Sequence, residues 1–98
     1  MAKLRIFKLL NQKLNRMKFG ILLSGCGVYD GAEIQEATMA MLAITEAGHD
    51  YQCISLNKDQ HHVINHLNGE ELSESRNMMV EAARIARGEV VELSLIHI

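Results

Sequence analysis

The chain has 98 residues, of which 48% are hydrophobic and 22% charged, and its formal net charge is −2; this composition indicates one small globular domain. Six of the ten basic residues lie within the first 18 positions, whereas all twelve acids lie at Asp30 or later, so residues 19–98 carry four bases against twelve acids. This distribution argues against a nucleic acid as partner, because phosphate recognition needs clustered positive charge. No apolar run approaches the roughly 18 residues of a membrane span, so we expect no membrane partner either.

Residues 1–16 form a separate basic segment. Its apolar residues recur at helical spacing at positions Leu4, Phe7, Leu10 and Leu14. Because it is basic, amphipathic and free of acids, the segment is compatible with a mitochondrial presequence, although it lacks serine. It is also compatible with an upstream extension of a reading frame that starts at Met17, or with a helix that lies on a membrane surface.

The first predicted elements surround a glycine-rich turn. The apolar run 18–23 predicts a buried strand, and SGCGVYDG at 24–31 predicts the turn that follows it. Asp30 and Glu33 have capping-box spacing, which predicts a helix over 30–47 that ends at a glycine. Its apolar face is expected to contain Ile34, Ala37, Ala40, Met41, Ala43, Ile44 and Ala47.

The rest of the chain continues the alternation of strands and helices. The run 51–56 predicts a second strand, 73–87 a helix with Met79, Ala82, Ala83 and Ala86 inward, and 90–93 a third strand. The polar stretch 57–71 is expected to hold a small hairpin or excursion. This order predicts an α/β fold with a parallel sheet built from βαβ units.

Two features of the first turn suggest a dinucleotide site and a cysteine nucleophile, but the spacing of the glycines supports neither. Gly25, Gly27 and Gly31 follow a strand and precede a helix, as in dinucleotide sites, but their spacing departs from G-x-G-x-x-G by one residue. Cys26 lacks the flanking glycines of a nucleophile elbow. We therefore interpret the glycines as a structural turn and Cys26 as a small turn residue. With only one other cysteine, Cys53, the chain has no disulfide framework, and we expect both to be thiols.

Two groups of polar residues remain as candidates for a site. Glu33 and Glu36 lie one turn apart at a helix start, near the carboxyl edge of the sheet where α/β proteins place their sites. One of them could act as a general acid or base if desolvation raised its pKa, whereas acids at a helix N-terminus are also favoured by the helix dipole alone. The loop histidines His61, His62 and His66 show no third ligand at metal spacing, so we expect no metal.

Three stretches, SGCGVYDGAEIQEAT, HHVINHLNGEELSESRN and EAARIARGE, resemble the bacterial enhancing-lycopene-biosynthesis proteins and their mitochondrial vertebrate relatives. These proteins belong to the PfpI-like, class I glutamine amidotransferase-like superfamily. The resemblance runs from about Met17 to Leu93, and the SGCGVYDG run is its most specific part. It implies a flavodoxin-like αβα sandwich, of which residues 17–93 would be the N-terminal part.

The resemblance also implies a reaction. Members of the family are associated with isoprenoid biosynthesis and with a glyoxalase III-type conversion of glyoxal to glycolate that needs no cofactor. Their nucleophile is a cysteine on an elbow in the second half of the fold, beside a carboxylate from the first helix. Glu36 matches that carboxylate and Glu33 matches a second acid common in the superfamily, so these two are the candidate catalytic residues. A small aldehyde would be the substrate of the full-length protein, which we expect to form a homodimer.

The resemblance further implies that this chain stops before the elbow cysteine and is inactive alone. A non-enzymatic family member or a binding fragment is the alternative. The ending SLIHI resembles translated library adapter, so residues 94–98 are expected to be a non-native tail after the domain at 17–93 and the extension at 1–16. The expected compartment is the cytoplasm, or the mitochondrion if residues 1–16 are a presequence.

Overall fold

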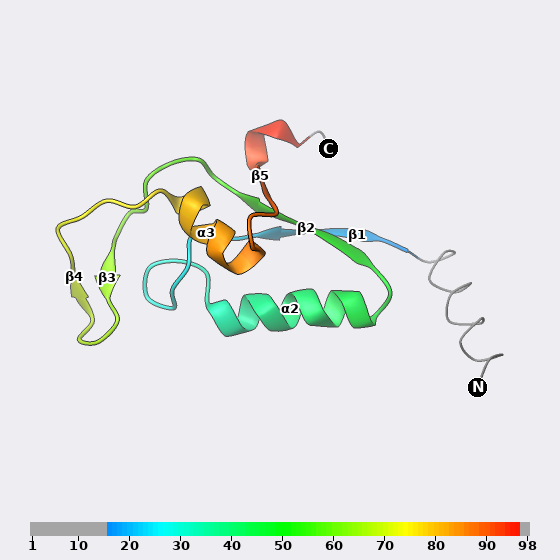
Figure 1. Cartoon of the computed structure of the whole chain (residues 1–98), viewed down its shortest axis with the longest axis horizontal. Coiled ribbons are helices and arrows are strands. Elements are labelled where there is room, and N and C mark those ends of the chain that lie inside the picture. Colours follow the sequence, from blue (N-terminus) through cyan, green and yellow to red (C-terminus); the bar gives the residue numbers. More distant parts are fainter. Residues whose placement is uncertain (1–15, 97–98) are drawn as a thin grey trace.

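The computed structural model describes residues 16–96. The extension predicted at 1–16, apart from Arg16, and positions 97–98 of the predicted tail lie outside the described residues. The elements in chain order are β1 (Lys18–Leu22), α2 (Ile34–Glu46), β2 (Asp50–Ser55), β3 (Ile64–Asn65), β4 (Glu70–Glu71), α3 (Met78–Ala86), β5 (Val90–Glu92) and the 3-10 turn η1 (Leu93–Leu95) (Figure 1).

The main sheet has three parallel strands in the order β1-β2-β5. Gly20 lies opposite Gln52, and Ile54 lies between Leu22 and Val91. Each crossover from one strand to the next contains a helix, as parallel pairing requires. The α/β fold and the parallel pairing of the first two strands, both predicted from the sequence, are therefore confirmed.

Both helices cover the same face of this sheet. The buried core consists of Leu23, Cys53 and three alanines from the two helices, Ala37, Ala82 and Ala86. Since side chains alternate across a strand, the other face of the sheet carries Gly20, Gln52 and Ile54. That face forms an open groove of about 520 Å³. The core is small, because most of its members are alanines.

The start of α2 differs from the sequence prediction. The helix begins at Ile34 and its N-cap is Glu33, so the predicted capping box with Asp30 as the cap is wrong. The physical reason is a distant partner: the Asp30 carboxylate accepts a hydrogen bond of 2.8 Å from the amide of Ile64 instead. The predicted apolar face was also too wide, since Ile34 is 47% exposed and the alanines at 40, 43 and 47 are exposed, leaving Ala37 as the buried contact.

The second helix begins later than predicted. Its N-cap is Asn77, whose side chain accepts from the amide of Val80 at 2.9 Å, so residues 73–77 precede the helix. Asn77 is held there by a bridge to Asp59 and by a 2.8 Å hydrogen bond from its side-chain amide to Asn57. Tertiary pairing therefore replaces the first predicted turn of α3. Two of the four predicted inward positions, Ala82 and Ala86, are buried, whereas Met79 and Ala83 are only half-buried.

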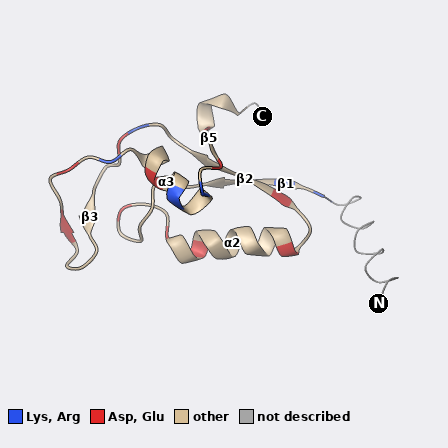
Figure 2. Ribbon diagram, in the orientation of Figure 1, with Lys and Arg blue, Asp and Glu red and all other residues tan. Residues whose placement is uncertain are grey.

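The polar stretch between β2 and α3 contains the expected small hairpin. Ile64 and Asn65 pair antiparallel with Glu71 and Glu70. Leu67, at the tip, is 96% exposed. The hairpin carries acids and no lysine or arginine (Figure 2). Within residues 16–96, no helix has both the length and the apolar character that crossing a bilayer requires.

Candidate active site

The carboxyl edge of the sheet is shaped by the loop that follows β1. Gly27 and Gly31 close this loop, because the amide of Gly27 donates to the carbonyl of Ala32 at 2.9 Å and that of Gly31 to Gly27 at 2.8 Å. Gly27 has φ +151°, and a Cβ at Gly31 would lie 2.7 Å from the amide nitrogen of Cys26. These glycines are needed to fold the loop on itself, which supports their interpretation as a structural turn.

The two candidate carboxylates have different surroundings. The Glu33 carboxylate accepts hydrogen bonds from the amides of Gln35 at 3.2 Å and Glu36 at 2.8 Å, so it is occupied as the helix cap. Glu36 lies on the first turn of α2 and is exposed. The partial burial expected for Glu36 is therefore not observed in this chain, because it lies on the solvent side of a helix whose buried contact is Ala37. Its catalytic role stays a prediction.

Neither cysteine has the environment of an activated nucleophile. Both are free thiols, with Cys53 buried and Cys26 half-buried. Burial raises the pKa of the Cys53 thiol. Burial also raises the pKa of the Cys26 thiol, and the Glu81 carboxylate adds to this increase more than Arg84 offsets it. Because a reactive cysteine needs a lowered pKa, these surroundings support the interpretation of Cys26 as a small turn residue.

A cleft of about 280 Å³ opens at the same edge of the sheet. It is lined by Ser24 and residues 29–31 of the glycine-rich loop, by residues 60–62 and by Met78. Neither Glu33 nor Glu36 lines this cleft. The structure therefore separates the candidate carboxylates from this cleft.

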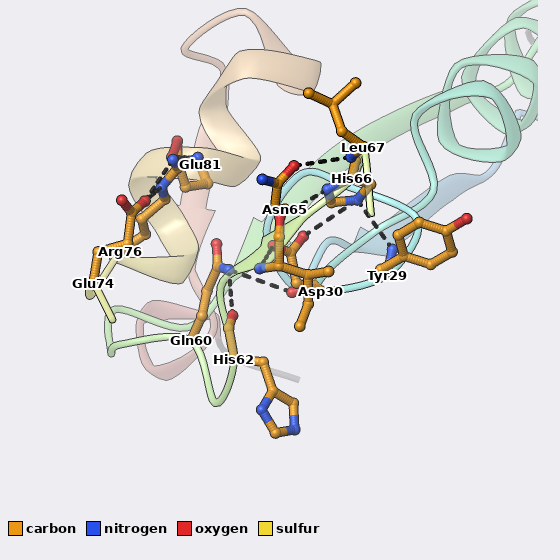
Figure 3. Close-up of polar contacts among 11 residues, drawn as sticks. Tyr29, Asp30, Gln60, His62, Asn65, His66, Leu67, Glu74, Arg76 and Glu81 are labelled. Carbon is orange, nitrogen blue, oxygen red and sulfur yellow. Dashed lines mark hydrogen bonds and ion pairs between the residues drawn. The ribbon is translucent and has the colours of Figure 1, made fainter. Parts of the chain in front are cut away.

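A buried polar cluster next to the cleft was not foreseen from the sequence (Figure 3). The amide nitrogen of Gln60 donates to the carbonyls of His62 at 3.0 Å and Asp30 at 3.4 Å. Asp30 Oδ1 and Gln60 Oε1 are both buried without a hydrogen-bond partner. No local pattern marks Asp30 and Gln60, because the loops that bring them together are 30 residues apart.

The loop histidines do not converge on one point. His62 Nδ1 lies 3.1 Å from Glu71 Oε1, and the His61 ring packs edge-on against His62. His66 instead stacks on Tyr29, with ring centroids 4.8 Å apart. Within the described ranges, no group of three or more His, Cys, Asp or Glu side chains is placed to hold a metal ion.

Comparison with known proteins identifies the superfamily whose fold this chain has. The chain has the flavodoxin-like fold of the class I glutamine amidotransferase-like superfamily. A solved structure of an isoprenoid biosynthesis protein with an amidotransferase-like domain, from Ehrlichia chaffeensis, superposes with a TM-score of 0.82 at 39% sequence identity. It covers 84% of this chain, which covers 39% of that one. No protein-family model matches the chain.

Two curated relatives match the chain, and the name of the human one contains the same class. The chain is 42% identical over 80 residues to the rat mitochondrial ES1 protein homolog, and the match covers 81% of the chain. It is 42% identical over 78 residues to the human mitochondrial glutamine amidotransferase-like class 1 domain-containing protein 3, with 79% of the chain covered. The chain spans 30% and 29% of these relatives' lengths. Both relatives are named as mitochondrial, which is compatible with the alternative compartment considered above.

Proposed function

We propose that this chain is the N-terminal part of a glyoxalase III-type enzyme that converts glyoxal to glycolate without a cofactor, and that Glu36 is its acid–base group. The observation that carries the proposal is the difference between the two acids of α2. Glu33 is engaged with two backbone amides, whereas Glu36 is exposed on the first turn of α2, the helix that follows the carboxyl edge of the sheet. Sites of open α/β sheets form at that edge.

The proposed reaction needs a thiolate and a carboxyl group that act together. The thiolate attacks one aldehyde carbon of glyoxal and forms a hemithioacetal. Glu36 then moves the proton of that carbon to the neighbouring carbonyl carbon, while the hydroxyl proton of the hemithioacetal passes to the neighbouring oxygen, which yields a thioester of the hydroxy acid. Water cleaves the thioester and restores the thiol. One carbon is oxidised while the other is reduced, so no external oxidant is required.

We infer that the thiolate comes from outside the 98 residues. Burial holds the pKa of both Cys26 and Cys53 above its ordinary value, and neither residue has the glycine spacing of an elbow. The relatives are more than three times as long as the matched segment. We therefore place the nucleophile in the part of the full-length protein that this chain does not contain.

The test uses the protein extended by its contiguous downstream coding sequence. Glu36→Gln should lower the rate of glyoxal consumption and glycolate formation by about 10²–10⁴-fold, because it removes a general acid–base group. Glu33→Gln, the matched control, should retain most of the activity because it affects a cap. Unchanged rates in Glu36→Gln, or glyoxalase activity of the 98-residue chain alone, would contradict the proposal.

For the compartment, we propose the mitochondrion, with residues 1–16 as the targeting segment. The support is the basic, acid-free amphipathic pattern of these residues together with the names of the rat and human relatives. A fluorescent protein that carries residues 1–16 should enter mitochondria. The matched control replaces Arg5 and Arg16 with Glu and should stay in the cytoplasm. Cytoplasmic fluorescence from the unaltered fusion would support the cytoplasmic expectation instead.

A further inference from the structure

We propose that Asp30 and His66 form a latch that holds the hairpin against the glycine-rich loop, and that a single proton closes it. The latch joins Tyr29 and Asp30 of the loop with Ile64 and His66 of the hairpin (Figure 3). It is independent of the proposed glyoxalase reaction, because it involves neither Glu36 nor a nucleophilic cysteine.

The hydrogen bonds of His66 identify the protonation state of its imidazole in this arrangement. His66 Nε2 accepts from the amide of Tyr29 at 3.2 Å, so this nitrogen carries no proton. The other ring nitrogen, Nδ1, lies 3.0 Å from the carbonyl oxygen of Ile64, to which it must donate, since a carbonyl can only accept. The imidazole is therefore neutral in this arrangement.

In this state one oxygen of the Asp30 carboxylate lacks a hydrogen-bond donor. Its side chain is 6% exposed, and Oδ2 accepts from the amide of Ile64 at 2.8 Å. Its other oxygen, Oδ1, is buried without a partner and lies 3.9 Å from His66 Nε2. A buried polar atom without a partner is costly. A proton on His66 Nε2 would supply the missing donor after a shift of about 1 Å to ordinary hydrogen-bond distance.

The exchange of partners favours the protonated latch. The Tyr29 amide loses its acceptor, but this residue is 61% exposed and water can replace the imidazole. In return, a buried carboxylate gains a charge-assisted hydrogen bond, which is about twice as strong as a neutral one. Contacts that require the proton hold the hairpin more tightly when the imidazole of His66 is protonated.

Other titratable groups near the latch do not supply the proton that Asp30 Oδ1 lacks. Cys26, which is close enough to feel the charge of Asp30, has a thiol pKa raised by burial and stays neutral. On the hairpin, Glu71 pairs with His62 rather than with His66, and Glu70 is exposed. The Tyr29 ring stacks on the imidazole, with ring centroids 4.8 Å apart.

The latch also has a consequence for the cleft. Tyr29 and Asp30 line it from the loop side, and residues 60–62, which lead into the hairpin, line it from the other side. Fixing Ile64 and His66 to the loop fixes the distance between these two walls. The protonation of one histidine would thus set how freely the cleft opens.

Backbone hydrogen exchange of the 98-residue chain tests the latch. At about pH 5.5 and about pH 7.5, on either side of the histidine range, exchange of segment 62–72 is compared with that of α2 after correction for the intrinsic rates. Segment 62–72 should exchange on the order of five-fold more slowly at the lower pH, with no such change in α2. His66→Gln keeps an acceptor for Tyr29 but cannot gain a proton, so the difference should vanish. His61→Gln, the matched control, should keep it.

A second variant keeps the test decisive if His66→Gln does not fold. Asp30→Asn retains an acceptor for the Ile64 amide and places an N–H donor where Oδ1 lies. It should protect segment 62–72 equally at both pH values. Equal exchange of the wild-type segment at the two pH values, or a pH difference that persists in either Asp30→Asn or His66→Gln, would overturn the proposal.

Discussion

The hydroxyl group of Ser55 donates a 2.6 Å hydrogen bond to the carbonyl oxygen of Leu23, and both residues are buried. Leu23 follows β1 and Ser55 ends β2, so this bond lies just below the glycine-rich loop. The amide of Leu23 also donates to Ile54 at 2.8 Å. The two strand ends are thereby joined at the point where the loop leaves the sheet, and the Ser55 hydroxyl has a partner although it is fully enclosed.

Ser55→Ala should lower the free energy of unfolding by about 1–2 kcal/mol, because it leaves the buried carbonyl of Leu23 without the hydroxyl donor. Urea denaturation followed by circular dichroism measures this change. Ser73→Ala, at an exposed position before α3, is the matched control and should change stability by less than about 0.5 kcal/mol. Equal effects of the two substitutions would show that the Ser55–Leu23 bond contributes nothing specific.

Two glycines separate the cost of backbone strain from the cost of a collision. Gly27 and Gly69 both have positive φ, +151° and +78°. A Cβ at Gly27 would clash with the Asp30 carboxylate and lie 2.9 Å from the His66 ring, whereas a Cβ at Gly69 would meet nothing within 4 Å. Gly27→Ala should therefore destabilise the fold by at least about 1–3 kcal/mol more than Gly69→Ala. A similar loss of unfolding free energy in both variants would contradict this.

Features of the fold that depend on neighbouring residues were predictable from the sequence. Apolar runs bounded by glycines predicted β1 and β2, and the alternation of strands and helices predicted their parallel pairing. The start of α2 was wrong because the partner of Asp30 is Ile64, 34 residues away. The start of α3 was wrong because Asn77 pairs with Asp59. Both errors have one physical cause, since a distant partner competed with a local helix signal.

The candidate site also combines local features with features that depend on distant residues. The cap role of Glu33 is local, because its carboxylate accepts from the amide of Glu36 three residues later. The Asp30–His66 latch joins two loops, and residue types alone do not reveal it. The histidines of the polar loop were noticed as a group, yet His66 contacts Tyr29 and not the other two. Their proximity in sequence suggested a shared role that their geometry does not support.

The two cysteines should react with a thiol reagent at clearly different rates. Cys26 is half-buried, whereas Cys53 is 1% exposed. Burial raises the pKa of both thiols, so each should contain less thiolate at neutral pH than a free cysteine, and its rate should keep rising above about pH 8.5. Alkylation followed by peptide mass spectrometry should show Cys26 modified first and Cys53 only when the chain unfolds. Cys26 alkylation faster than that of free cysteine near pH 7 would contradict the raised pKa.

The uncovered face of the sheet should make the chain associate as its concentration rises. Leu22 is 60% exposed and lies on this face beside Ile54, which lines the open groove. An apolar sheet face of this kind favours contact with another surface over contact with water. Leu22→Thr keeps a strand-forming residue but removes apolar area, so association should become roughly five- to tenfold weaker, which corresponds to about 1 kcal/mol of lost burial.

Sedimentation velocity over a concentration series measures this association. Leu42→Gln is the matched control, because Leu42 is 56% exposed on α2, away from the open face, and glutamine preserves helix propensity. It should associate like the unaltered chain. If the chain stays monomeric at every concentration, or if Leu42→Gln weakens association as much as Leu22→Thr, the open sheet face is not the surface through which copies meet. Weakening by Leu22→Thr alone would place the contact on the face opposite the helices, where an αβα sandwich carries its second helical layer.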